Sequence, residues 1–125
     1  MNDSSTRTIM LIDDSKVSRM FARDFIQQLH PAWRIVEAGT GEEGLQMLDS
    51  VAPDLVILDV NMPGIGGLAT ASLMRGQQPS LPICILTANI QSATRLRAEG
   101  LDVDFAEKPV TRERIAGILA LLERG

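Results

Sequence analysis

Four consecutive apolar residues, Leu55 to Leu58, constrain the fold of this chain more than any other stretch. The run is too short for a helix, and no polar residue alternates within it. A strand that is covered on both faces of a parallel sheet has this pattern. The run ends at Asp59, and a turn containing Asn61 and Pro63 follows. An aspartate at the carboxyl end of a central parallel strand lies where open α/β sheets bind ligands.

Further apolar runs predict four more strands, and helical patterns lie between them. The predicted strands are Thr8–Ile12, Trp33–Val36, Ile83–Leu86 and a shorter, less apolar one from Val103 to Ala106. The predicted helices span about residues 15–30, 40–52, 68–76, 90–99 and 115–122, with apolar residues at helical spacing. Strands that alternate with helices in this way form βαβ crossovers, which predict one parallel sheet covered on both sides.

The boundaries of these elements have recognisable signals. Ser15 and Thr40 can cap the helices that follow them. Pro31 should end the first helix at His30, because proline disfavours helical geometry in the residue before it. The helix that begins near Thr40 should close before Pro53.

Composition limits the class of protein. At 125 residues the chain has room for one domain, and its net charge of −4 argues against nucleic acid as a direct partner. The single cysteine, Cys84, lies within an apolar run and is predicted to be a buried hydrophobic residue, which fits a reducing cytoplasm. Residues 1–6 are polar and do not form a signal peptide, and no apolar run is long enough to span a bilayer. We therefore expect a cytoplasmic protein.

Charged and hydroxyl side chains follow four of the predicted strands at their carboxyl ends. Asp13 and Asp14 follow the first strand, Asp59 the third, Thr87 the fourth and Lys108 the fifth. Three carboxylates at one place repel one another unless a cation neutralises them, which predicts a hard divalent ion such as Mg²⁺. A lysine and a hydroxyl beside that ion suit a phosphoryl group, and a carboxylate can itself accept one.

Four motifs in this chain resemble the receiver domain of two-component response regulators, most closely the stand-alone chemotaxis type. They are Leu11–Ser15, Asp59–Gly64, Leu86–Ala88 and Glu107–Pro109. The resemblance covers residues 7–123, after a predicted disordered tail at 1–6. It implies a flavodoxin-like (βα)5 three-layer sandwich with a five-stranded parallel sheet in the order 2-1-3-4-5. It also implies a bacterial phosphorelay, with Mg²⁺ as the cofactor and a sensor histidine kinase as the phosphoryl donor.

The resemblance assigns a role to each residue of the site. Asp59 would be phosphorylated, and Lys108 would pair with the phosphoryl group. Asp14, Asp59 and the backbone carbonyl of Asn61 would hold Mg²⁺, with Asp13 acting directly or through water.

Three further residues have roles in switching and in the lifetime of the phosphoryl group. Thr87 would move to bond the phosphoryl group, and Phe105 would rotate inward as Thr87 moves. Asn61 and Asn89 occupy the positions that tune dephosphorylation in the family. A downstream protein would bind to the face formed by the helix at 90–99, the strand at 103–106 and the last helix. The protein would be a monomer or a weak phosphorylation-dependent dimer.

The chain departs from the family pattern after Pro63-Gly64, where Ile65-Gly66-Gly67 replaces a common Met-Asp-Gly. The missing acid is outside the predicted metal cluster, so the chemistry should survive.

Three functional hypotheses remain open. The first is a phosphorylation-activated switch that is not an enzyme and has no separate effector domain. The second is a longer regulator whose output domain would follow Gly125, and the third is a metal-dependent phosphatase that works through an aspartyl phosphate. The hydrolases of that third class carry a second aspartate two residues after the nucleophile, where this chain has Asn61. This difference favours the switch.

Overall fold

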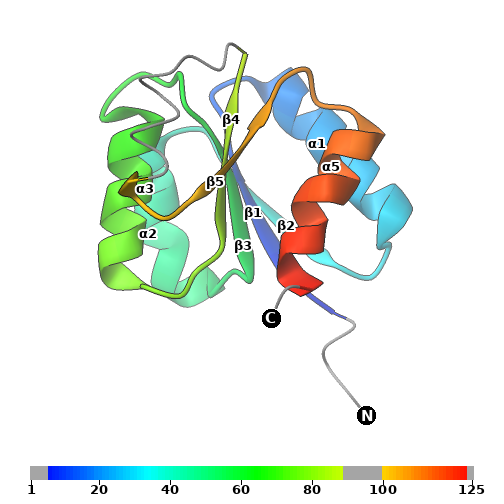
Figure 1. Ribbon diagram of the computed structural model, residues 1–125, viewed down its shortest axis with the longest axis horizontal. Helices are drawn as coiled ribbons and strands as arrows, with labels where there is room; N and C mark the ends of the chain where they lie inside the picture. The colour runs from blue at the N-terminus through cyan, green and yellow to red at the C-terminus, as the bar shows by residue number, and fades with distance from the viewer. Residues whose placement is uncertain (1–5, 89–99, 124–125) are drawn as a thin grey trace.

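A computed structural model describes residues 6–88 and 100–123 of the chain. The described residues form a central parallel sheet between two layers of helices (Figure 1). In chain order the elements are β1 (Thr8–Ile12), α1 (Lys16–Leu29), β2 (Arg34–Ala38), α2 (Gly41–Val51), β3 (Leu55–Asp59), α3 (Gly66–Gln77), β4 (Ile83–Thr87), β5 (Asp104–Glu107), α5 (Arg112–Leu119) and the 3-10 turn η2 (Ala120–Glu123).

The five strands lie in the order β2-β1-β3-β4-β5, and every neighbouring pair is parallel. The register pairs Ile12 of β1 with Leu58 of β3, and Asp59 with Leu86 of β4. The helices α2 and α3 cover one face of the sheet, and α1 and α5 cover the other (Figure 1). These observations confirm the predicted α/β fold and strand order. The predicted tail at residues 1–6, apart from Thr6, and the predicted helix at 90–99 lie outside the described residues.

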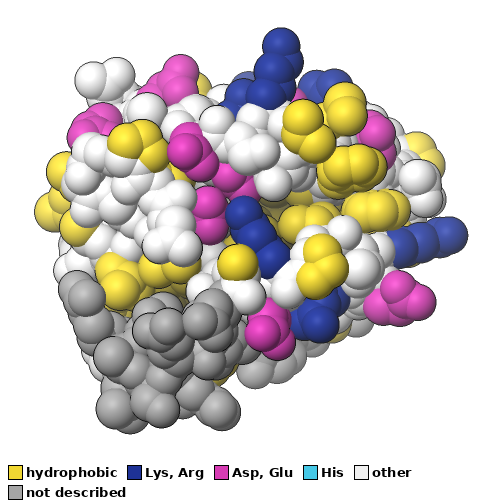
Figure 2. Space-filling model, turned by 90° about the horizontal axis from the view of Figure 1, so that it is seen from above, with side chains coloured by type: hydrophobic (Ala, Val, Ile, Leu, Met, Phe, Trp, Pro, Cys, Tyr) yellow, Lys and Arg dark blue, Asp and Glu magenta, His cyan; other side chains and the backbone are white. Residues whose placement is uncertain are grey.

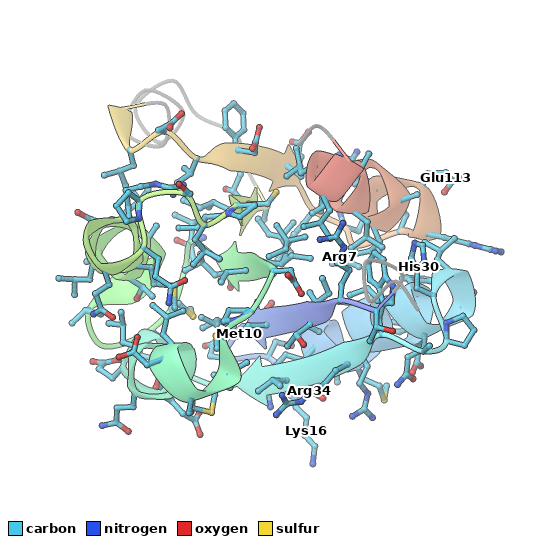
Figure 3. The ribbon with its side chains drawn as sticks, turned by 90° about the horizontal axis from the view of Figure 1, so that it is seen from below. Arg7, Met10, Lys16, His30, Arg34 and Glu113 are labelled. Carbon is cyan, nitrogen blue, oxygen red and sulfur yellow. The ribbon has the colours of Figure 1, made fainter. Side chains whose placement is uncertain are left out.

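The two-sided core explains the uninterrupted apolar runs. Successive side chains of a strand point to opposite faces of its sheet, so alternate residues of β3 enter different clusters. Val56 and Leu58 pack towards α2 and α3, whereas Leu55 and Ile57 pack towards α1 and α5. Met10 of β1 is also fully buried, while Lys16 at the start of α1 points away from the protein (Figure 3). Cys84 is buried as predicted, and burial raises the pKa of its thiol to about 12.

The predicted helix caps are confirmed. The Ser15 hydroxyl accepts a hydrogen bond from the Ser18 amide at 3.2 Å, and the Thr40 hydroxyl accepts one from the Glu43 amide at 3.0 Å. Helix α1 ends at Leu29, immediately before the His30-Pro31 pair. A cap of this type contributes about 1 kcal/mol to stability.

Several predicted boundaries are wrong; strand β5, for example, is Asp104–Glu107 and not Val103–Ala106, and α5 begins at Arg112 and not at 115. Strand β2 is Arg34–Ala38 and not Trp33–Val36, because its pairing with β1 continues to Ala38 opposite Ile12. Helix α3 passes through Gly76 and ends at Gln77, since one glycine weakens a helix without breaking it. The last helical segment changes to a 3-10 turn after Leu119.

The close approach of α3 to the end of β3 gives a testable prediction. A Cβ atom at Gly67 would lie 2.2 Å from the backbone oxygen of Asp59 and 2.6 Å from the Cα of Val60. Backbone atoms cannot yield without moving a strand, so Gly67→Ala should lower the free energy of unfolding by about 1–3 kcal/mol in urea titrations. Gly76→Ala is the matched control in the same helix, where a Cβ meets no atom within 4 Å. It should instead stabilise the protein by about 0.5–1 kcal/mol. Equal effects of the two substitutions would contradict this packing.

Candidate functional site

The carboxyl edge of the sheet brings together the charged residues predicted from the sequence. Asp13 directly follows β1, Asp59 is the last residue of β3, Thr87 is the last residue of β4, and Lys108 directly follows β5. Seen from above this edge, acidic and basic side chains adjoin near the centre, and hydrophobic side chains lie along one flank (Figure 2). Because all five strands are parallel, their carboxyl ends lie at the same edge of the sheet, and residues far apart in sequence meet there.

Three carboxylates form the centre of the site. One oxygen from each of Asp13, Asp14 and Asp59 lies within 4.8 Å of the others. Asp13 and Asp59 are each only 5% exposed, whereas Asp14 is exposed to solvent. The Asp13 carboxylate also accepts a hydrogen bond from the Ser15 amide at 2.9 Å. This bond ties the cluster to the first turn of α1.

Lys108 is the cation that contacts the buried carboxylates. Its Nζ lies 3.4 Å from Asp13 Oδ2 and 3.4 Å from Asp59 Oδ1. Both distances exceed the roughly 2.7–2.9 Å of a strong charge-assisted bond. The ammonium therefore lies between two carboxylates without a close bond to either. Among the described residues, Lys108 is the one cation that forms an ion pair with this cluster of three carboxylates.

This imbalance affects the protonation of Asp59. Burial raises the pKa of its carboxyl group, and the neighbouring Asp13 carboxylate raises it further. Lys108 and a weak hydrogen bond from the Asn61 amide, at 3.4 Å, act in the opposite direction but do not reverse the rise in pKa. In the protein without a bound cation, the ionised form of Asp59 is thus less favoured than it is for an aspartate in water.

The residues present fit a magnesium ion. The cluster offers only hard carboxylate oxygens and includes no cysteine or histidine, and Mg²⁺ prefers such oxygen ligands. One exposed and two buried carboxylates leave the site open towards solvent on the Asp14 side. Magnesium ions in proteins usually keep several water ligands, which such an opening can supply. The part of the predicted ligand set that uses the Asn61 carbonyl stays a prediction.

The residues predicted to switch lie on neighbouring strands, Thr87 at the carboxyl end of β4 and Phe105 within β5. Thr87 is 3% exposed and ends β4, and the Lys108 amide donates a hydrogen bond to its carbonyl at 2.7 Å. Phe105 lies on β5 opposite Ile85 and is partly buried against the core. The predicted role of Asn89 falls on a residue outside the described part of the chain.

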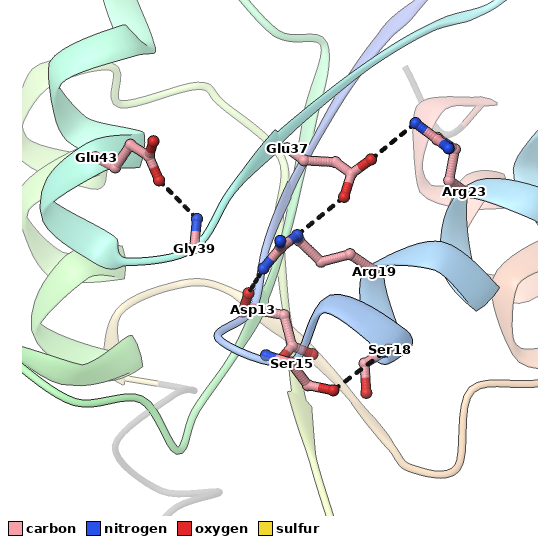
Figure 4. Close-up of polar contacts among 8 residues, drawn as sticks. All are labelled: Asp13, Ser15, Ser18, Arg19, Arg23, Glu37, Gly39 and Glu43. Atoms are coloured by element: carbon pink, nitrogen blue, oxygen red, sulfur yellow. Dashed lines mark hydrogen bonds and ion pairs between the residues drawn. The ribbon is translucent and has the colours of Figure 1, made fainter.

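Two features of this edge were not predicted from the sequence. One is a network in which Arg19 of α1 bonds Glu37 of β2 and the backbone carbonyl of Asp13 (Figure 4). Arg19 follows the cap Ser15 by four residues, but its partner Glu37 is on another element, so no local pattern reveals the pair.

The second missed feature is an apolar groove of about 610 Å³ next to Lys108. Exposed side chains of α1, Val17 and Phe21, form part of its lining with Pro109 and Val110. Val17 and Phe21 are 57% and 49% exposed, whereas Ala22 and Ile26 of the same helix are buried, a difference that helical spacing alone does not reveal.

The model of the response regulator receiver domain matches residues 9–120, which is nearly the whole chain. The chain belongs to the response regulator receiver domain family. The predicted resemblance to two-component receiver domains is therefore confirmed.

Curated relatives of this receiver domain are response regulators. The nitrate/nitrite response regulator NarL of Escherichia coli K12 is 34% identical over 89 residues, which cover 71% of this chain and 41% of NarL. The transcriptional regulatory protein PrrA of Mycobacterium leprae is 31% identical over 125 residues, which cover 97% of this chain and 52% of PrrA. The chain thus spans about half the length of these relatives.

Solved structures show the same CheY-like fold. The chemotaxis protein CheY4 of Vibrio cholerae superposes with a TM-score of 0.86 at 22% identity, covering 94% of this chain and 98% of CheY4. A LuxR-family response regulator from Aurantimonas also gives 0.86, at 28% identity, covering 95% of this chain and 86% of that structure. Among the described residues of the receiver domain, no helix is long and apolar enough to cross a membrane.

The pKa of Asp59 predicts how stability depends on pH. Because folded Asp59 holds its proton more tightly than it does in the unfolded chain, ionisation of this group destabilises the folded state. This cost is absent below the pKa of the unfolded chain and complete above the raised pKa of the folded protein. Asp59→Asn should therefore stabilise the metal-free protein at neutral pH, and the gain should shrink as the pH falls through that window.

The measurement is urea unfolding in EDTA from acidic to neutral pH. Asp49→Asn is the control, because Asp49 is exposed on α2 and lies outside the cluster. A stability gain for Asp59→Asn that does not depend on pH would contradict the assigned cause.

Proposed function

We propose that this receiver domain is a phosphorylation-activated switch that accepts a phosphoryl group on Asp59 from the phosphohistidine of a sensor histidine kinase. The observation that carries the proposal is the position of Asp59. Its carboxylate is buried at the end of the central strand, beside two further carboxylates and within reach of Lys108. A buried carboxylate among cation ligands is a nucleophile suited to phosphoryl transfer.

In the transfer step an Asp59 carboxylate oxygen bonds to phosphorus as the phosphorus–nitrogen bond of the donor breaks. The imidazole nitrogen leaves with the bonding electron pair, and the product is an aspartyl phosphate. Bound Mg²⁺, held by Asp13, Asp14 and Asp59, would supply positive charge beside the transferred phosphoryl oxygens. Lys108 supplies the second positive charge and would keep one phosphoryl oxygen in place.

The apolar groove next to the site supports a protein as the donor. Phe21 and Phe25 stack on α1 with ring centroids 6.4 Å apart and line the groove together with Val17. Large hydrophobic side chains that are exposed beside a polar site are typical of protein contact surfaces. We infer that α1 and the segment after β5 contact the kinase while its phosphohistidine reaches Asp59.

Chemistry at Asn61 favours a switch over a phosphatase. A carboxamide at this position does not donate or accept protons as a second aspartate would, so it cannot act as the general acid–base of turnover. The aspartyl phosphate would then persist long enough to change the surface of the domain. A stand-alone switch and the receiver of a longer regulator would share this site and this step.

The proposed output runs from Thr87 to Phe105. The Thr87 hydroxyl would bond a phosphoryl oxygen, and Phe105 would turn inward as Thr87 moves. Phe105 lines a groove of about 210 Å³ between β5 and α5, together with Ala106, Gly117 and Leu121. We propose that a downstream protein binds to the face that includes β5 and α5, and this groove lies between those two elements.

The first test is phosphorylation at Asp59. Incubation with acetyl phosphate and Mg²⁺ should add one phosphoryl group per chain, measured by intact-mass spectrometry. Asp59→Asn should fold but remain unlabelled, because the nearly isosteric carboxamide is not a nucleophile. Asp49→Asn on α2 should label like the wild type. Full labelling of Asp59→Asn would overturn the assignment, and rapid multiple turnover of a phosphate ester by the wild type would favour the phosphatase.

The second test separates phosphorylation from switching. Thr87→Ala should still be labelled at Asp59, since Thr87 is not the acceptor. It loses a bond to a charged group worth about 1.5–3 kcal/mol, which would shift the switching equilibrium on the order of 10–100-fold. We expect the NMR shifts at residues 90–106 on addition of beryllofluoride, a mimic of the phosphoryl group, to be largely lost. Thr87→Ser retains the hydroxyl and should restore them. A full wild-type response in Thr87→Ala would show that another route carries the signal.

A further inference from the structure

The guanidinium group of Arg19 connects α1, β1 and β2 behind the acidic cluster. Its Nε donates to Glu37 Oε1 at 2.9 Å, and its Nη1 donates to the backbone carbonyl of Asp13 (Figure 4). The side chain is only 16% exposed. Arg23, one turn further along α1, contacts the other oxygen of Glu37 at 3.0 Å but is 45% exposed.

The bond from Arg19 completes the set of interactions that fix Asp13. The Asp13 amide donates to Ala38 at 3.1 Å, and its carboxylate accepts from the Ser15 amide and approaches Lys108. With its carbonyl held by Arg19, the peptide unit between Asp13 and Asp14 has one orientation. The direction in which the Asp14 side chain leaves the backbone depends on that peptide unit.

Asp14 depends on this constraint more than the other two carboxylates do. Asp13 and Asp59 are each 5% exposed and are held by the surrounding sheet and by Lys108, whereas Asp14 is exposed. An exposed side chain with few neighbours is placed mainly by its own backbone. Arg19 is therefore the group best situated to set where the third carboxylate of the cluster lies.

The effect of Arg19 is geometric more than electrostatic. Glu37 pairs with the guanidinium, and the guanidinium reaches Asp13 through the neutral backbone carbonyl and not through a carboxylate. Only a planar guanidinium offers donors on two sides in fixed directions, which lets one side chain hold Glu37 and the Asp13 carbonyl together.

We propose that Arg19 is a positioning residue, which orients the Asp13–Asp14 corner for Mg²⁺ through the Asp13 carbonyl while Glu37 holds the guanidinium in place. This inference rests on the proposed function, because it assumes that the cluster is the magnesium site. Groups that orient metal ligands from behind typically change metal affinity 10–100-fold when they are removed.

The test compares two arginines that share one partner. Arg19→Met removes the contacts with Glu37 and with Asp13, whereas Arg23→Met removes only a contact with Glu37. Magnesium affinity is measured by titrating the folded proteins with MgCl₂ alone and following backbone amide shifts by NMR. We expect Arg19→Met to weaken Mg²⁺ binding about 10-fold and Arg23→Met to leave it within about twofold of the wild type.

A purely structural role would give a different result. It would lower the melting temperature of Arg19→Met and leave the magnesium dissociation constant of the folded fraction unchanged, which would overturn the inference. If Arg19→Met does not fold, Arg19→Lys is used, because it keeps the charge and the length but lacks the two-sided fork. Weakening of at least about threefold in that variant supports the inference, and a wild-type value overturns it.

Labelling of the wild type separates the two levels of the proposal. If acetyl phosphate and Mg²⁺ do not phosphorylate the wild type, the proposed function fails. If the wild type is phosphorylated and binds Mg²⁺, but Arg19→Met and Arg23→Met bind it equally well, only the role of Arg19 fails.

Discussion

Burial of β3 on both faces is the constraint on which the rest of the structure depends. A strand in this position must be apolar along its length, so a charge can follow only where the covering helices end. Asp59 occupies that position, 5% exposed and paired in register with Leu86. Because β1 and β4 flank β3 in parallel, their carboxyl ends place Asp13 and Thr87 beside it. The site is a consequence of the topology: Asp13 and Asp14 follow β1, and the ends of β3, β4 and β5 contribute one group each.

The same arrangement creates a conflict of charge. Folding brings three carboxylates within 4.8 Å of one another. In the described part of the chain the ammonium of Lys108 lies 3.4 Å from each of the two buried carboxylates, which is long for a charge-assisted bond. Burial and Asp13 raise the pKa of Asp59, so the folded protein without a cation bears an electrostatic cost. A binding site often retains such a cost, because the ligand that relieves it is then bound more tightly. The loose contacts of Lys108 fit a group that would be shared with an incoming phosphoryl oxygen.

Local patterns in the sequence predict the parts of this structure that local physics determines. Two-sided strands, hydroxyl caps at Ser15 and Thr40, and the helix end before Pro31 are all confirmed. The predicted start of β2 at Trp33 is wrong, because β2 begins at Arg34. Trp33 instead stacks on His30, with ring centroids 3.7 Å apart, and belongs to the turn after α1. Residues on different elements escape such reasoning, as Arg19 and Glu37 do, because sequence spacing does not encode which side chains meet across a sheet edge.

Backbone pairing between the ends of β4 and β5 offers a physical route from the site to the rest of the domain. The Lys108 amide donates to the Thr87 carbonyl at 2.7 Å, and Thr87 pairs with Glu107 in the register of the sheet. Both side chains that we propose to contact the phosphoryl group therefore belong to one hydrogen-bonded pair of strand ends. A pull on the Thr87 hydroxyl and a pull on the Lys108 ammonium would act on the same bond. Phe105 is two residues before that pair on β5, so movement of the strand ends would reach it directly through the backbone.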